Sequence, residues 1–281
     1  MKHISKIYTA LIFAILYTPI LVLILFSFNS TNNTGKFTGF SLKWYSELFS
    51  SPSTFAALRN TLVLAILSAI IATLIGTAAA VGISKMKNKY IKGGITSVTN
   101  IPMMNPDIVT GISMMLLFVF VGNLLGNAEK LNFFTLLIAH VTFNIPYVIL
   151  SVLPKLRMMD KHLSEAALDL GCTPLQAFFK VELPAIMSGV STGFIMAFTL
   201  SLDDFVISYF TSGSDFQTLP ILIYSMTKKE VKPTIYALSS LMIVAILALL
   251  IVSNLRSEKD AKIRHKAEKS KKVKEIGGKV Y

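Results

Sequence analysis

Apolar residues along this chain gather into six runs of about twenty residues, separated by short polar connections. Crossing ~30 Å of hydrocarbon takes about 20 helical residues, so each run is long enough to span a membrane. Backbone polar groups find no water in lipid, so each run is expected to be helical and the fold class all-α. The predicted spans cover residues 7–28, 61–84, 98–122, 133–153, 186–208 and 234–255.

Composition agrees with a polytopic membrane protein. Of 281 residues, 53% are hydrophobic and 15% are charged, whereas soluble domains carry about 25% charged residues. The first run is longer than the apolar core of a cleavable signal peptide, so we interpret it as a retained helix. We therefore expect a transmembrane domain over residues 1–255 and a separate basic tail over 256–281.

Basic residues are distributed unevenly between the two sides of such a protein. With six spans both ends share one side, and that side would hold 20 of the 27 Lys and Arg residues. Since basic loops stay in the cytoplasm, both termini are predicted to be cytoplasmic. The tail is expected to lie against anionic lipid, and no nucleic-acid partner is expected. Lys228, Lys229 and Lys232 do not fit this orientation, and no role follows for them.

One cytoplasmic connection, residues 155–184, is much longer than the others, and its pattern predicts two short helices within 160–184, here called the elbow. Gly171 follows the first helix, as glycine does just past a helix end. Thr173 is a suitable N-cap for the second, with Pro174 at its first position and Gln176 completing a capping box. The apolar faces would be formed by Leu163, Ala166, Ala167 and Leu170, and by Leu175, Phe178 and Phe179. We expect Leu183-Pro184 to end the second helix, and the elbow to be a docking surface or a hairpin lying on lipid.

The elbow sequence, EAALDLG followed by Phe179, Val181 and Leu183-Pro184, resembles the EAA loop of permease subunits in ATP-binding-cassette importers. In that family the short helices seat in a groove of an ATPase subunit and transmit its closure to the membrane helices. Cys172 and Ser188 depart from the usual Ala and Pro without affecting the docking role. The resemblance implies coupling roles for Glu165, Ala166, Ala167, Asp169, Gly171, Leu175, Phe178, Phe179, Leu183 and Pro184.

Further segments, in the same order, are similar to the polyamine permeases of this family. They are SFNS (27–30), SLKWYSELF (41–49), MNPDIVTGIS (104–113), HVTFNIPYVIL (140–150), SLDDFVISYFTSG (201–213) and LPILIYSM (219–226). The resemblance implies spermidine or putrescine as substrate, with Trp44, Asp107, Ser201, Asp203 and Asp204 along its route. It also implies a second permease subunit, two ATPase subunits that bind ATP and Mg²⁺, and an extracytoplasmic polyamine-binding protein. No cofactor is expected in this chain.

Three carboxylates lie within or beside the predicted spans: Asp107, Asp203 and Asp204. Acids in a membrane avoid lipid and by default mark a pathway or a partner. At 1.5 Å per residue, Asp107 lies about 18 Å into the third span and the aspartate pair about 27–29 Å along the fifth. This predicts an acidic route from the outer mouth to mid-depth, which suits a polycation. Pro102 and Pro106 should kink or break the third span.

The route residues also admit other interpretations. The aspartate pair would instead cap a helix or hold a partner subunit, and Asp107 would bond freed backbone donors. Tyr147 and Trp44 would offer aromatic faces to ammonium groups, although Trp44 would equally suit an interfacial anchor.

Catalysis by the chain itself is not indicated. Gly189-Val190-Ser191-Thr192-Gly193 matches a nucleophile elbow, but that motif needs a strand–turn–helix setting, so close helix packing is the better interpretation. The sequence lacks a GxxxxGK[ST] phosphate loop. His140 is expected to be a hydrogen-bonded interior residue, without metal-ligand spacing. The predicted function is an importer permease; the alternatives are a permease for another small solute or an ion-coupled secondary transporter.

Overall fold

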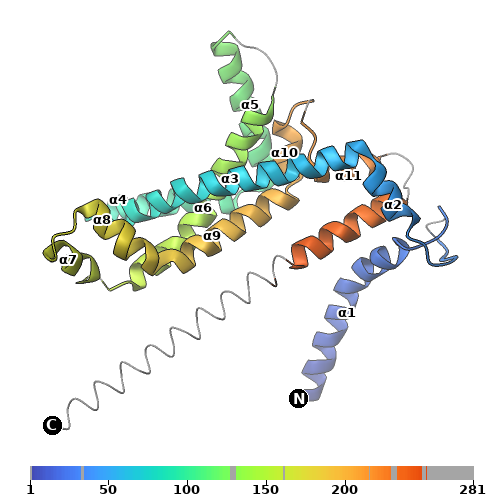
Figure 1. Ribbon diagram of the computed structural model, residues 1–281, viewed down its shortest axis with the longest axis horizontal. Coiled ribbons are helices and arrows are strands. Elements are labelled where there is room, and N and C mark those ends of the chain that lie inside the picture. Colours follow the sequence, from blue (N-terminus) through green and yellow to red (C-terminus); the bar gives the residue numbers. More distant parts are fainter. Residues whose placement is uncertain are drawn as a thin grey trace. The chain divides into compact units, whose positions relative to one another are not determined.

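The computed structural model describes residues 2–32, 35–126, 131–160, 162–214, 216–228, 233–248 and 251. Within them the regular structure is helical, apart from one isolated antiparallel bridge between Asn29 and Phe40 (Figure 1). The elements are α1 (Lys2–Phe26), α2 (Lys43–Ser50), α3 (Pro52–Lys85), α4 (Lys89–Met104), α5 (Asp107–Leu124), α6 (Phe133–Met158), α7 (His162–Asp169), α8 (Pro174–Ala177), the π-helix η1 (Phe178–Glu182), α9 (Leu183–Asp203), α10 (Val206–Thr211), α11 (Leu219–Thr227) and the helix Pro233–Ala248.

Five helical stretches are long and apolar enough to cross a membrane: Lys6–Phe26, Pro52–Lys85, Asp107–Leu124, Phe133–Met158 and Pro174–Asp203. Each falls on a predicted run, which confirms the all-α membrane fold. The sixth run is represented by the shorter apolar helix Pro233–Ala248. The end of that run, the basic tail 256–281, Lys229 and Lys232 lie outside the described residues. The cytoplasmic placement of both termini stays a prediction.

The chain divides into two compact units, one within Met1–Leu62 and Asp215–Ala248, the other built on Val63–Ser214. The core of the first unit consists of Leu48, Ala57, Leu219, Leu222 and Leu238. Polar contacts tie its segments together. The amide of Leu219 donates to Thr61 Oγ1 at 2.7 Å, and the hydroxyls of Tyr45 and Ser240 are 2.8 Å apart.

Small residues bring the central helices of the second unit together. Its core includes Ala69, Ala72 and Ala80 of α3, Val148 and Val152 of α6, and Ile186 and Ala197 of α9. A β-carbon at Gly189 would lie 2.7 Å from Lys155 Cγ and 2.9 Å from the Ser151 carbonyl oxygen, and one at Gly193 would lie 3.2 Å from Val148 Cα. Because only glycine allows α9 to approach α6 this closely, the predicted packing role of the Gly189/Gly193 pair is confirmed.

Two predicted spans are interrupted. The third divides into α4 and α5 at Asn105 and Pro106, as its prolines predicted, although Pro102 stays inside α4. Asn105 Nδ2 donates to Thr110 Oγ1 at 3.2 Å across this break. The fifth predicted span, 186–208, joins two elements: α9 ends at Asp203, and α10 begins at Val206.

The predicted end of the second elbow helix at Leu183-Pro184 is wrong. Helices α8, η1 and α9 follow one another without a break. In the π-turn η1 the Leu183 amide bonds back to the Phe178 carbonyl. Pro184 has no N–H and would clash inside a regular helix, and the wider π-turn just before it lets the helix continue. The elbow is therefore helically continuous with the fifth span.

Candidate functional site

At one end of the second unit, α7 and α8 form the predicted elbow (Figure 1). Gly171 adopts φ +86°, a left-handed conformation that suits glycine. The amide of Cys172 donates to the Ala167 carbonyl at 3.0 Å, as in a Schellman C-cap. Thr173 and Gln176 bond each other's backbone amides in a capping box. Both predicted helix boundaries at this turn are confirmed.

Large apolar side chains of the elbow point away from the unit. Leu170 is 86%, Leu175 71% and Phe179 60% exposed, whereas Ala167 and Ala177 are buried beneath them. Contiguous exposed apolar surface marks an interaction site. Of the other residues predicted to couple, Phe178 and Leu183 are half-buried, while Glu165, Ala166, Asp169, Gly171 and Pro184 are exposed.

A buried carboxylate that the sequence patterns did not single out lies beneath the elbow. Glu182 is 3% exposed, and its Oε1 accepts from Lys85 Nζ at 3.0 Å and from the Ser164 hydroxyl at 2.8 Å. These contacts join η1 to the C-terminal end of α3 and to α7. The only signal in the sequence is one acid in an apolar stretch, VELPAI, at the start of a span.

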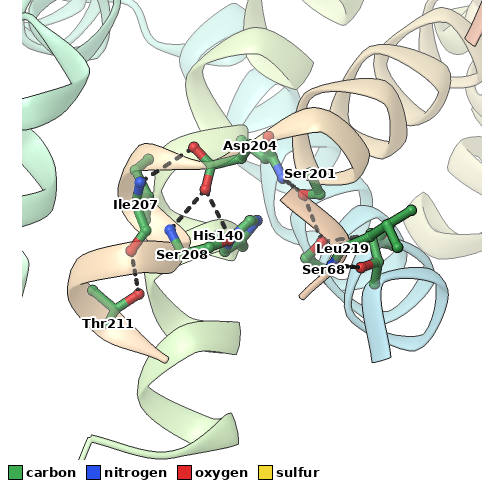
Figure 2. A network of polar contacts seen from close by, with 11 residues as sticks. Ser68, His140, Ser201, Asp204, Ile207, Ser208, Thr211 and Leu219 are labelled. Carbon is green, nitrogen blue, oxygen red and sulfur yellow. Dashed lines mark hydrogen bonds and ion pairs between the residues drawn. The ribbon is translucent and has the colours of Figure 1, made fainter. Parts of the chain in front are cut away.

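At the opposite end of the same unit, Asp204 lies in the break between α9 and α10 (Figure 2). Its Oδ1 accepts from the Ile207 amide at 3.3 Å, and its Oδ2 accepts from the Ser208 amide at 2.7 Å and lies 3.5 Å from His140 Nε2. The side chain is only 9% exposed. Asp204 thus satisfies backbone donors at the start of α10, which is the capping alternative for this residue.

His140 and Ser201 are also engaged inside the unit. His140 is 1% exposed and its Nε2 lies 3.0 Å from the Ser208 hydroxyl, so the predicted interior histidine is confirmed. Asn144 Nδ2 donates to Ser201 Oγ at 2.7 Å, and Ser201 Oγ lies 2.8 Å from Ser68 Oγ. Because the Ser68 hydroxyl donates onward within α3, Ser201 donates to Ser68, and this chain of donors joins α6, α9 and α3 (Figure 2).

This polar cluster was missed from the sequence, although its spacing carried a signal. His140 and Asn144 are four residues apart, which places them on one face of a helix. Ser201, Asp204 and Ser208 follow an i, i+3, i+7 spacing, which would also share a face. Polar residues repeated at helical spacing within two apolar runs indicate that the two runs meet there.

Of the three carboxylates predicted along the route, two are exposed: Asp107, the first residue of α5, and Asp203, the last of α9. A helix N-terminus favours a carboxylate, which suits Asp107. The ring centroid of Tyr147, the predicted aromatic residue of the route, is 5.4 Å from that of Phe143. One turn after Asp107, α5 packs against α10, where Gly111 allows the close approach.

Trp44 belongs to α2 in the first unit. It is 6% exposed, and its indole N–H donates to the Asn29 carbonyl at 2.6 Å. The ammonium group of Lys43 lies 5.3 Å from its ring centroid. The ring therefore already faces a cation of this chain, and a role on a substrate route stays a prediction.

The sequence motif that matches a nucleophile elbow, residues 189–193, lies within α9. Ser191 lies on a continuous helix and its hydroxyl donates to the Met187 carbonyl at 2.7 Å, unlike a nucleophile held on a strand–turn–helix elbow. In the part of the chain that the structure describes, no three His, Cys, Asp or Glu side chains form a group able to hold a metal ion.

Comparison with known proteins identifies this architecture. Residues 72–257 match the family described as binding-protein-dependent transport system inner membrane component. The chain belongs to this family of permeases. The permease is 38% identical over 234 residues to the putrescine transport system permease protein PotI of Escherichia coli K12, which covers 83% of each chain. It is 39% identical over 244 residues to the spermidine/putrescine transport system permease protein PotC of the same organism, which covers 87% of this chain and 90% of that one.

A solved structure supports the same fold at greater evolutionary distance. A chain of a bacterial ABC transporter that imports alginate superposes with a TM-score of 0.69 at 17% identity, over 92% of the permease and 94% of that chain. The permease is thus a bacterial inner-membrane protein homologous to polyamine importer subunits. Its homologues belong to importers that work with a binding protein. The matched region holds the elbow and, apart from Ser68, the polar cluster at the opposite end of the second unit.

Proposed function

We propose that this chain is one permease subunit of a polyamine importer driven by partner ATPases. The observation that carries the proposal is the exposed apolar elbow, capped at Gly171 and Thr173 and helically continuous with α9. A protein partner would cover Leu170, Leu175 and Phe179, because exposed apolar surface of this kind marks an interaction site. An ATPase that closes on ATP would displace the elbow and, through η1, move α9.

The remaining components belong to other chains. Two ATPase subunits bind ATP and Mg²⁺, and an extracytoplasmic binding protein delivers spermidine or putrescine. A second permease subunit completes the transmembrane pair. The exposed apolar side chains of α1, such as Ile7, Leu11 and Leu16, provide surface for contact with that subunit as well as with lipid. In this proposal the chain acts as a transporter subunit, and ATP hydrolysis takes place in its partner subunits.

The exposed carboxylates support a cationic substrate. A polyamine carries several ammonium groups along an apolar stem, and Asp107 and Asp203 offer negative charge in the same unit. Two unit charges 4 Å apart attract by about 1 kcal/mol in water and about 4 kcal/mol at an effective dielectric constant near 20. The Tyr147 ring adds a face for an ammonium group. Such contacts bind the substrate weakly and briefly, which suits a substrate that must pass through the permease.

The docking role is tested by the double variant Leu175→Glu with Phe179→Glu. Placing two charges in an apolar interface should abolish both co-purification of the ATPase and uptake of labelled spermidine. Leu175→Met with Phe179→Leu keeps the surface apolar and is the matched control, expected to retain both activities. If the double glutamate variant kept both activities, the proposal would be overturned.

The substrate class is tested by competition of labelled spermidine uptake. Putrescine should compete, whereas sulfate and neutral amino acids should not; the reverse pattern would indicate another solute. Asp107→Asn and Asp203→Asn should each lower uptake about tenfold, since losing about 1.4 kcal/mol corresponds to that factor. Glu47→Gln, an exposed acid on α2, is the charge-matched control. Uptake that continued without ATP hydrolysis and followed an ion gradient would instead identify a secondary transporter.

A further inference from the structure

Two sets of polar contacts join α3 to the η1–α9 helix, one near each end of the second unit. Near the elbow, the Glu182 carboxylate accepts from Lys85 Nζ at 3.0 Å. At the opposite end, Ser201 Oγ lies 2.8 Å from Ser68 Oγ and accepts from Asn144 at 2.7 Å. At 1.5 Å per residue, the two contacts are roughly 26 Å apart along α3 and roughly 28 Å apart along η1–α9. The two lengths agree, so α3 and η1–α9 run antiparallel and are joined by a polar contact near each end.

The packing between these contacts does not by itself fix how the helices are aligned lengthwise. Between them, Ala72 and Ala80 of α3 and Ile186 and Ala197 of α9 belong to one apolar core that also contains Val148 of α6, against which both helices pack. Apolar contacts of this kind favour closeness but have little direction. A buried polar contact is directional, and sliding the helices would leave its groups unpaired, which is how single polar residues fix register in helical assemblies.

Glu182 carries the greater constraint of the two. Its side chain is 3% exposed, and a buried carboxylate is unfavourable unless it is paired. Oε1 receives both donors, from Lys85 and Ser164, while Oε2 accepts no hydrogen bond from the described residues. The two hydrogen bonds that offset the cost of burying this carboxylate are therefore kept only while α3 and α7 both stay in contact with η1. Lys85 itself is 59% exposed, so it can be replaced without opening the core.

We propose that Glu182 is a positioning residue for energy coupling: it fixes the elbow to α3, and with Ser201 it makes α3 and α9 move as one rod, so that elbow displacement reaches Asp203. This rests on the proposed function, in which the elbow receives the ATPase. Without the Glu182 contact the elbow would still dock its partner, but its displacement would be absorbed at η1 and would not reach the far end of the unit.

The test uses the permease together with the subunits that co-purify with it, reconstituted with the binding protein and labelled spermidine. Glu182→Leu replaces the ionised group with an apolar side chain of similar size, which keeps the site filled. It should retain ATPase co-purification and ATP hydrolysis while the spermidine imported per ATP falls at least tenfold. Lys85→Met should lower the same ratio about fivefold, and Lys87→Met, which removes one positive charge two residues away, should leave it unchanged.

Rescue and distance measurements separate positioning from general stability. The exchange Lys85→Glu with Glu182→Lys restores a pair of opposite charges between the two positions and should return the ratio to within about threefold of wild type. Spin labels at Met86→Cys and His162→Cys, in Cys172→Ser background, should hold one separation with and without trapped nucleotide, and lose it in Glu182→Leu.

The possible failures are distinguishable. An unchanged ratio in Glu182→Leu, or in Lys85→Met should the former fail to fold, would overturn the positioning role. Loss of ATPase co-purification in Glu182→Leu would place the residue in docking and would also overturn it. A wild-type complex without an ATPase would contradict the proposed function itself.

Discussion

The neighbouring aspartates Asp203 and Asp204 should respond in opposite ways to the same substitution. Asp204 caps α10 through two backbone amides, at 3.3 and 2.7 Å, and lies beside His140 with 9% of its side chain exposed. Asp203 is exposed at the end of α9. Alanine at position 204 should therefore destabilise the fold, and alanine at position 203 should impair transport with little effect on stability.

The magnitudes follow from these contacts. Replacing a helix cap by alanine costs about 0.5–2 kcal/mol, and leaving a buried donor unpaired costs about 1–3 kcal/mol. Asp204→Ala should thus lower the free energy of unfolding by about 2–4 kcal/mol. Each kcal/mol shifts Tm by about 2–4 °C in a protein of this size class, so Tm should fall by about 4–16 °C. Asp203→Ala should stay within about 0.5 kcal/mol, as surface substitutions do.

Thermal unfolding of the detergent-purified permease by circular dichroism, with spermidine uptake measured in parallel, checks both halves. Asp204→Asn keeps one acceptor oxygen, so its Tm should lie between those of wild type and Asp204→Ala. Equal Tm values for the two alanine variants would refute the division of roles. So would an Asp203→Ala protein that transports as well as wild type.

Three further substitutions test the packing and the polar cluster. Gly189→Leu should destabilise the protein by about 1–3 kcal/mol, seen as a lower Tm, because its β-carbon would lie 2.7 Å from Lys155 Cγ. Ser191→Ala should leave both Tm and uptake unchanged, since the Ser191 hydroxyl only bonds its own helix; a complete loss of uptake would revive an enzymatic role. Ser201→Ala leaves the Asn144 amide without its acceptor and should lower the free energy of unfolding by about 1–3 kcal/mol. A Tm equal to that of wild type would show that this hydrogen bond is dispensable.

The parts of the fold that local sequence determines were predictable. Run length and apolarity located the spans, and the break before Asp107 followed from Pro106, which can neither donate nor continue a helix. The elbow turn followed from Gly171 and from the Thr173/Gln176 capping box, because those residues act within a few positions of themselves.

The missed features depend on segments far apart in the chain. Glu182 meets Lys85 across 97 residues and Ser201 meets Ser68 across 133, separations over which no periodicity gives a register. The π-turn before Pro184 was also not predicted, because proline normally marks the end of a helix. Here α9 begins at Leu183, directly after the π-turn, and continues through Pro184. The break after Asp203 carried no Gly or Pro, and hydrophobicity alone favoured a continuous span.

Helix interruptions explain how the acidic residues of one unit divide their roles. Each break frees backbone amides, and an adjacent aspartate either accepts hydrogen bonds from those amides or stays available to a substrate. Asp204 uses both carboxylate oxygens on α10, whereas Asp107 begins α5 exposed and Asp203 ends α9 exposed. Two adjacent aspartates therefore need not both face a substrate, and their mutual repulsion is reduced because one is held by amide donors. Under the proposed function, the cation meets Asp107 and Asp203, and Asp204 fixes the break that presents Asp203 at the end of the α3–α9 rod.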